Sequence, residues 1–348
     1  MYARATATTP VAALRGNVTS HRRRHLSKRV WLPIRPEPTG YGTPNTPRRL
    51  LHANDASTTS NQRPRNPAAT IFATNEDRKR MNAGQSMEVT GLFDKQAEIY
   101  VKGRPTYPKE WYSMLAALTP QHSLAWDVGT GNGQATVGLL EHYDQVVASD
   151  ISDAQLKYAI QHPRVRYIHT PASISDDEMV NLIGGGQENS VDLVTVAAAI
   201  HWFDLPRFYS LVKRLLRQPG GIIAVWCYNG MVVSPDFDLV MKRLHESCLP
   251  FWDPRTKYAW GGYTTLPFPF ESVGLGREGE PITLEIPKEL SFQGFERMLR
   301  SFSAVATAKD RGADLLSEDV IKELHRAWGA HDLVRTVTYK AFMLVGRL

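Results

Sequence analysis

The chain has 348 residues, of which 42% are hydrophobic and 22% are charged, so it is long enough to bury a full core. Its only cysteines are Cys227 and Cys248, which excludes a disulfide framework and a cysteine-ligated zinc site. No apolar run approaches the roughly 20 residues that span a bilayer. We therefore expect a soluble protein that does not bind a membrane.

The positive charge is concentrated in the first quarter of the chain. Residues 1–88 carry 15 Lys and Arg against 5 Asp and Glu, whereas the remainder carries 26 and 30. Residues 1–86 contain no acid before Glu37 and include Arg22-Arg23-Arg24. This composition predicts a disordered basic leader, which is either a chloroplast or mitochondrial transit peptide or a dispensable extension of a cytoplasmic protein. Because the rest of the chain is mildly acidic, we expect no nucleic-acid partner.

The most informative stretch is Trp126-Asp127-Val128-Gly129-Thr130-Gly131-Asn132-Gly133, between an apolar run and a helix predicted over 134–143. Glycines allow a sharp turn and a close approach to a ligand, and a helix start presents free amide groups. The dinucleotide fingerprint G-x-G-x-x-G is absent, since Gln134 or Thr136 stands at its third glycine. The pattern resembles motif I of Rossmann-like S-adenosylmethionine-dependent methyltransferases. Asp127, at the strand end, suits a cofactor with an ammonium group.

A second acid supports this interpretation. Residues 145–150 are a predicted strand that ends in Asp150, 17 positions after Gly133. An acid at about this spacing accepts the ribose hydroxyls in βαβ nucleotide sites. The alternative is that Asp150 caps the next predicted helix, over 154–161.

Strands and helices alternate farther along the chain. Strands are predicted over 165–169, 190–200 and 220–228, and helices over 176–183 and 206–217. This alternation implies a parallel sheet with both faces covered, whose strands bind ligands at their carboxyl ends. The segments 129–133, 170–173 and 198–203, with Asp150, should therefore meet at one crevice.

The last third of the chain is less regular. Residues 229–319 are rich in aromatic side chains and have few periodic runs, so we predict that they form a substrate cap inserted after the fifth strand. Residues 336–345 alternate in polarity and predict a long final strand at the edge of the sheet.

Two further stretches resemble a particular family. FDKQAEIY at 93–100, followed by RPTYP at 104–108, and AAAIHWFD at 197–204 are similar to segments of trans-aconitate methyltransferase-like small-molecule methyltransferases of plants and fungi. The resemblance covers 91–348 and implies one methyltransferase domain over 87–348. It implies an α/β fold, with a Rossmann-like, seven-stranded, mostly parallel sheet whose last strand is antiparallel. The implied cofactor is S-adenosyl-L-methionine.

The resemblance also implies a set of cofactor-binding residues. Glycines 129, 131 and 133 would approach the methionine part, and Asp150 the ribose. Ile151 would lie against adenine, with backbone at Ala172 or the hydroxyl of Ser173 replacing the acid that often stands at Pro171. The remaining expected contacts are Tyr100 and Arg104, which close over the cofactor, and Ala198 and Trp202 at the end of the fourth strand.

His201 is the candidate catalytic residue. Histidine titrates near neutral pH, and its position at a strand end faces the expected crevice. It is either a general base or a packed histidine that orients the cofactor. A carboxylate acceptor needs no base, whereas a neutral hydroxyl or amine acceptor can require one.

These observations predict an S-adenosylmethionine-dependent methyltransferase, of EC class 2.1.1, that acts on a carboxylate or hydroxyl oxygen of a small molecule. Two alternatives remain at this point. A non-catalytic domain would bind the cofactor without turnover. An NAD-binding oxidoreductase would need a degenerate fingerprint, against which Gln134 argues.

Overall fold

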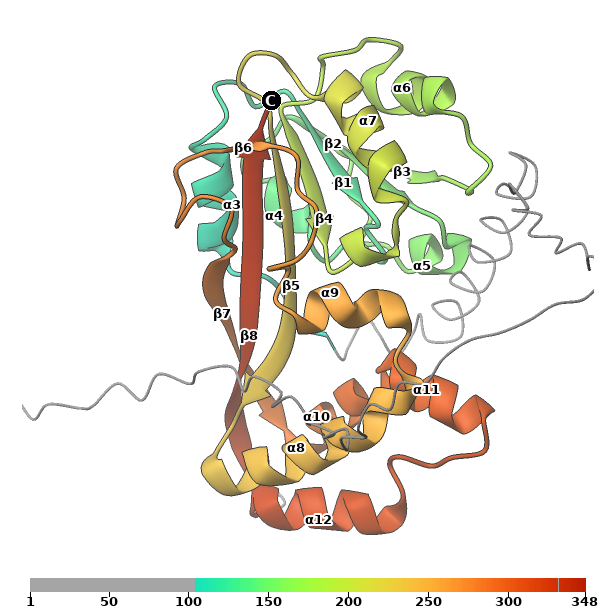
Figure 1. Cartoon of the computed structure of the whole chain (residues 1–348), viewed down its shortest axis with the longest axis vertical. Coiled ribbons are helices and arrows are strands. Elements are labelled where there is room, and N and C mark those ends of the chain that lie inside the picture. Colours follow the sequence, from blue (N-terminus) through green and yellow to red (C-terminus); the bar gives the residue numbers. More distant parts are fainter. Residues whose placement is uncertain (1–103, 331) are drawn as a thin grey trace, which may run out of the picture. The chain divides into compact units, whose positions relative to one another are not determined.

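The computed structural model describes residues 104–330 and 332–348 (Figure 1). The leader predicted over 1–86 lies outside the described residues, and so does Tyr100. Within the described part, no helix has both the length and the apolar character needed to cross a bilayer.

One mixed sheet forms the centre of the described structure. Its strands are β1 (Leu124–Val128), β2 (Gln145–Asp150), β3 (Val165–His169), β4 (Leu193–Ala197), β5 (Ile222–Val232), β6 (Glu271–Ser272), β7 (Ile282–Ser291) and β8 (Val334–Arg347). Their spatial order is β3-β2-β1-β4-β5-β8-β6, and β7 also pairs with β8. β1 to β5 are parallel, whereas β8 is antiparallel to β5. The predicted Rossmann-like sheet with an antiparallel last strand is confirmed, but the described sheet has eight strands, not seven.

The predicted strands differ from the observed ones mainly at their ends. The fourth strand stops at Ala197, because Ala198 adopts a left-handed φ of 55° and the 3₁₀ helix η1 (Ile200–Trp202) follows. β5 continues past the predicted end at 228, because it stays paired with β8 beyond a bulge between Tyr228 and Gly230.

Helices cover both faces of the sheet. Those that pack on one face are α3 (Lys109–Ala116) and α4 (Thr136–Leu139), and those on the other are α6 (Asp176–Gly184) and α7 (Leu205–Leu215) (Figure 1). Alternate side chains of β5 serve the two faces: the Trp226 ring meets Tyr112 of α3 edge-on at 6.3 Å, and Val225 packs in the core beneath α7. Burial on both faces explains why the parallel strands are nearly continuous apolar runs.

The helices that flank β2 are shorter than predicted. α4 covers only four of the residues predicted over 134–143, and the amides of Gly138, Leu140 and His142 bond three residues back, as in tighter turns. α5 (Asp153–Lys157) ends before the predicted 161, because the Ile160 amide donates to the Asn132 carbonyl at 3.3 Å. The segments on both sides of β2 therefore leave regular helical geometry near the glycine-rich loop.

The predicted cap over 229–319 is not one inserted unit. It contributes β6 and β7 to the sheet, and its helical part extends past residue 319. The helices concerned are α8 (Pro235–Cys248), η2 (Leu249–Phe251), η3 (Pro254–Thr256), α9 (Lys257–Trp260), α10 (Phe292–Arg300), α11 (Ser303–Asp310) and α12 (Glu318–Trp328). The alternation of Ile282, Leu284 and Ile286 is the signal that could have identified β7.

Helices α8, α10 and α12 share an aromatic core. Phe237, Phe295 and Trp328 are fully buried, and their ring centroids lie 5.0–5.3 Å apart. Figure 1 shows these helices together, beyond the carboxyl-terminal end of β5. The helical layer therefore lies on the side of the sheet where the parallel strands end, which is where ligands bind in such folds.

Candidate active site

The loop that follows β1 is held in left-handed backbone geometry. Gly129, Gly131 and Gly133 have φ values of 64°, 57° and 83°, which residues with a Cβ adopt only at a cost. Gly129 has a second constraint, because a Cβ there would lie 2.7 Å from the Cβ of Ala199. The sequence pattern thus reflects a backbone requirement.

Asp127 lies behind this loop, and the structure corrects its predicted role. Its fully buried carboxylate accepts hydrogen bonds at 2.7 Å from the hydroxyls of Thr130, Thr136 and Thr195. Burial raises its pKa, and the three hydroxyls oppose that rise. Because the carboxylate faces threonines from the loop, α4 and β4, it anchors the loop and does not line a pocket that could hold an ammonium group.

Asp150 lies at the end of β2, next to the glycine-rich loop. Its Oδ2 accepts from the Gly131 amide at 2.7 Å, and its Oδ1 accepts from the Ser152 amide at 2.8 Å. Burial raises its pKa, and both amides oppose the rise. The helix cap is Ser152, whose hydroxyl accepts from the Gln155 amide at 3.1 Å, so the capping alternative for Asp150 is wrong. A carboxylate has about four acceptor sites, so these two bonds do not exhaust its capacity for further donors.

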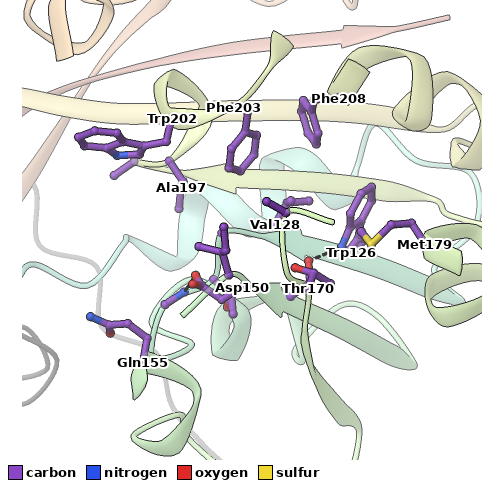
Figure 2. A pocket seen from close by; sticks show the side chains of 18 of the residues that line it. Trp126, Val128, Asp150, Gln155, Thr170, Met179, Ala197, Trp202, Phe203 and Phe208 are labelled. Carbon is purple, nitrogen blue, oxygen red and sulfur yellow. Dashed lines mark hydrogen bonds between the residues drawn. The ribbon is translucent and has the colours of Figure 1, made fainter. Parts of the chain in front are cut away.

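A pocket of about 550 Å³, here called the large pocket, opens at these strand ends. Figure 2 shows Trp202, Phe203 and Phe208 along one side and Asp150 on the opposite side. The predicted residues that line it are Gly129, Gly131, Asp150, Ile151, Ala172, Ala198 and Trp202. Its volume is within the usual range for a cofactor site.

Like Asp127, the predicted residues Ser173 and Gly133 do not line the large pocket. Ser173 is exposed and lies outside its wall. Gly133 packs against β3, since a Cβ there would lie 2.3 Å from the Tyr167 hydroxyl. That hydroxyl donates to the Ile160 carbonyl at 2.8 Å, so it is held in place. The third glycine is therefore required for packing of the loop.

We expect Gly133→Ala to lower the free energy of unfolding by about 1–3 kcal/mol, since it adds left-handed backbone strain and a clash. Gly185→Ala is the matched control, because Gly185 has a φ of 63° and an open Cβ position. Urea unfolding of both variants checks this. Addition of Tyr167→Phe should restore part of the loss only in the first variant; equal losses in both variants would contradict the packing role.

Sequence reasoning missed Arg207, at the start of α7. Its Nε donates to Asp176 at 2.8 Å, and its guanidinium also bonds the carbonyls of Ala172 and Ile174. Arg207 thereby fastens the loop after β3 to the edge of the large pocket, which it also lines. No motif signalled this role, because its partners, one carboxylate and two backbone carbonyls, are more than 30 residues away.

A second pocket of about 110 Å³, here called the small pocket, lies beside the first. Ala198 and Trp202 line both pockets. Arg104 and His201, predicted at the crevice, line the small pocket and not the large one, so the expected cofactor contact of Arg104 is corrected. Arg104 donates to the Tyr228 hydroxyl at 3.2 Å and to the Ser301 carbonyl at 2.8 Å.

His201 is almost completely buried in the wall of the small pocket. Its Nδ1 lies 3.3 Å from the hydroxyl of Tyr263, itself fully buried. Burial lowers the pKa of His201 to about 4, although the charge of Asp253 opposes this shift. The imidazole is therefore neutral at pH 7, and it is a weak base there.

This pKa predicts a pH-dependent stability. An unfolded histidine binds its proton near pH 6.5, so between about pH 6.5 and 4 the unfolded state holds more protons and stability falls as the pH is lowered. From pH 7 to 5 we expect His201 to contribute a loss of about 2 kcal/mol. Urea unfolding at both values should show a smaller loss for His201→Gln. An identical pH dependence in the two proteins would mean that His201 titrates normally.

Comparisons with known proteins agree with this geometry. Residues 126–225 match the model of a methyltransferase domain family. A protein named as a methyltransferase in Dictyostelium discoideum is 30% identical over 263 residues, which cover 73% of this chain and 94% of that protein. A fungal methyltransferase of Pestalotiopsis fici is 23% identical, over 71% of this chain and 91% of its own length.

A solved structure agrees as well. A structure described as a type II methyltransferase from Anaeromyxobacter dehalogenans has 35% identity and a TM-score of 0.60, covering 70% of this chain and 97% of its own. The chain belongs to the class I S-adenosylmethionine-dependent methyltransferases. S-adenosylmethionine is its cofactor. The large pocket, with its glycine-rich loop and the acceptor Asp150, has a suitable size and suitable polar groups to hold it.

Proposed function

We propose that this protein methylates an oxygen atom, of a carboxylate or a hydroxyl, on a small molecule that enters the small pocket. The observation that carries the proposal is the shared wall of the two pockets. Ala198 and Trp202 line both, so an acceptor in one pocket lies next to a cofactor in the other. The small pocket is also too narrow for a macromolecule to enter except by a side chain or a single base.

Within the large pocket, different residues bind different parts of the cofactor. Asp150 accepts the two ribose hydroxyls with the capacity that its amide partners leave. Ile151 and the Ala172 backbone lie against the adenine, and the loop at Gly129 and Gly131 approaches the methionine part. Bound there, S-adenosylmethionine supplies an electrophilic methyl group. The polypeptide contributes alignment, which is worth about 7–11 kcal/mol when two reactants are held in near-attack geometry.

His201 orients the Tyr263 hydroxyl beside the small pocket and does not act as a general base. Its lowered pKa makes it a weak base at neutral pH, and its Nδ1 is engaged with the Tyr263 hydroxyl. Trp202 adds an aromatic face beside the shared wall, and such a face stabilises a cationic sulfonium by about 0.5–2 kcal/mol. Arg255, whose guanidinium lies 5.0 Å from the Trp202 ring centroid, fixes that ring in place.

Calorimetry on the full-length protein tests the cofactor site first. We expect S-adenosylhomocysteine to bind and NADH not to bind. Transfer of labelled methyl is then measured on carboxylic acids and alcohols of low molecular weight, in parallel with protein and RNA mixtures. Label that appears only in protein or RNA would overturn the proposal.

A further inference from the structure

Five of the described residues that line the small pocket are Trp, Tyr or Phe. Trp252 and Trp260 meet at a centroid distance of 5.1 Å and an interplanar angle of 63°, and Trp252 lies 5.8 Å from Phe302. Trp202 and Tyr228 also line the pocket. Ring faces and edges of this kind bind a flat apolar body through offset and edge-to-face contacts.

One positive charge faces this aromatic wall. Arg104 is the only Lys or Arg among the described residues that line the small pocket, and its guanidinium carbon lies 5.2 Å from the Phe302 ring centroid. Bonds to Ser301 and Tyr228 fix its position. A guanidinium matches the geometry of a carboxylate, with which it forms strong charge-assisted hydrogen bonds.

The charge of the pocket disfavours an amine acceptor. Aromatic walls can hold a cation, but Arg104 would repel it. None of the described lining residues is an Asp or a Glu that could offset that repulsion. An aliphatic polycarboxylate is disfavoured too, since a single cation would leave its other charges buried among rings without partners.

The chemistry of the lining groups disfavours a neutral hydroxyl. Such an acceptor must lose a proton, yet burial lowers the pKa of His201 to about 4 and raises that of Cys227 to about 11. A carboxylate has no proton to lose. Its oxygen lone pair forms the new bond to the methyl carbon while the carbon–sulfur bond breaks and its electron pair stays on sulfur, which leaves a neutral ester and a neutral thioether.

We infer that the acceptor is a flat, apolar molecule with one carboxylate, that Arg104 binds this carboxylate in the small pocket, and that the product is a methyl ester. The inference rests on the proposed function, and it narrows the acceptor from any small oxygen nucleophile to an aromatic or similarly flat monoacid. It assigns Arg104, Trp252 and Trp260 to acceptor binding.

The first test compares two aromatic monoacids with an alcohol and an amine of the same ring and with an aliphatic tricarboxylate. Benzoate, cinnamate, benzyl alcohol, benzylamine and propane-1,2,3-tricarboxylate are titrated calorimetrically into the full-length protein saturated with S-adenosylhomocysteine. We expect binding of the two flat monoacids only. With the labelled methyl donor, their products should release labelled methanol in alkali, as esters do and ethers do not. Preference for the alcohol, the amine or the tricarboxylate would overturn the inference, as would failure of both monoacids to bind.

The second test removes the charge. Arg104→Gln should weaken benzoate binding about 10- to 100-fold, as expected for loss of a charge-assisted hydrogen bond. S-adenosylhomocysteine binding should change less than about twofold, because Arg104 does not line the large pocket. Arg104→Lys should give an intermediate loss, and it keeps the test open if Arg104→Gln fails to fold.

Arg311→Gln is the matched control. Arg311 also lies over a phenylalanine ring, Phe251 at 5.9 Å, and donates to the Pro250 carbonyl, but it lines neither pocket. It should bind benzoate like the unmodified protein. Equal benzoate affinity in Arg104→Gln and Arg311→Gln would overturn the role of Arg104. Failure of the unmodified protein to bind S-adenosylhomocysteine would instead contradict the proposed function itself.

Discussion

Replacement of Asp150 by alanine is expected to weaken S-adenosylhomocysteine binding by at least roughly 100-fold, which corresponds to about 3 kcal/mol. The carboxylate is almost completely buried at the pocket wall, where two hydrogen bonds from ribose hydroxyls to a charged acceptor would be lost together. The variant also leaves the amides of Gly131 and Ser152 without the acceptor that orients the loop. Calorimetric titration measures the change.

Asp153→Asn is the matched control for this prediction. Asp153 lies three residues away, but its side chain is 61% exposed and pairs with Lys157 in the first turn of α5. A surface ion pair of this kind contributes little, so we expect affinity within about twofold of the unmodified protein. Asp150→Asn separates shape from charge. Unchanged binding in both Asp150 variants would remove Asp150 from the cofactor site.

Replacement of Trp328 by alanine is expected to lower the free energy of unfolding by about 3–5 kcal/mol, as large-to-small changes of a buried aromatic residue do. The ring is fully buried between Phe237 and Phe295, and its Nε1 donates to the Leu333 carbonyl at 2.9 Å. It therefore joins α8, α10 and α12 to one another and to the start of β8. Urea unfolding followed by fluorescence and circular dichroism measures the loss.

The distribution of that loss reports on the helical layer. None of the described residues that line the large pocket belongs to α8, α10 or α12, so Trp328→Ala protein that remains folded should still bind S-adenosylhomocysteine. His325→Ala in the same helix is a milder comparison, because its ring packs only against Phe292, at 4.6 Å, among the ring contacts described. A loss below about 1 kcal/mol for Trp328→Ala would show that the layer is not part of the cooperative core.

Local patterns predicted several of the residues that line the large pocket. The glycines at 129 and 131 and the acid at 150 were identified because a backbone turn, and an acid at a strand end, are set by residues adjacent in sequence. Asp127 and Gly133 lie in the same motif, yet they serve the loop. Thr195, one of the three hydroxyl partners of Asp127, is 68 positions away, and Tyr167, which packs against Gly133, is 34 positions away, so the motif does not indicate either of them.

The small pocket depends on longer-range pairing. Arg104 was expected over the cofactor, but β8 pairs with both β5 and β7 and so brings α10 and α11 beside the end of β5, where Ser301 binds the guanidinium. The segment 229–319 was interpreted as a single cap because its aromatic residues dominate the pattern. Strand β7 is exposed at alternate positions, and its pairing with β8 makes it part of the sheet.

The sequence alone determined the alternation of strands and helices, the parallel sheet, the glycine-rich loop and the acid after β2, because each depends on the polarity period and backbone conformation of neighbouring residues. The antiparallel last strand was implied only by the family resemblance. Only the tertiary structure decided which polar groups anchor the loop and which face the pocket. It also decided that Arg104 and His201 line a separate pocket beside the cofactor site. Burial and hydrogen-bond partners set these roles, and both come from residues that meet only when the sheet is assembled.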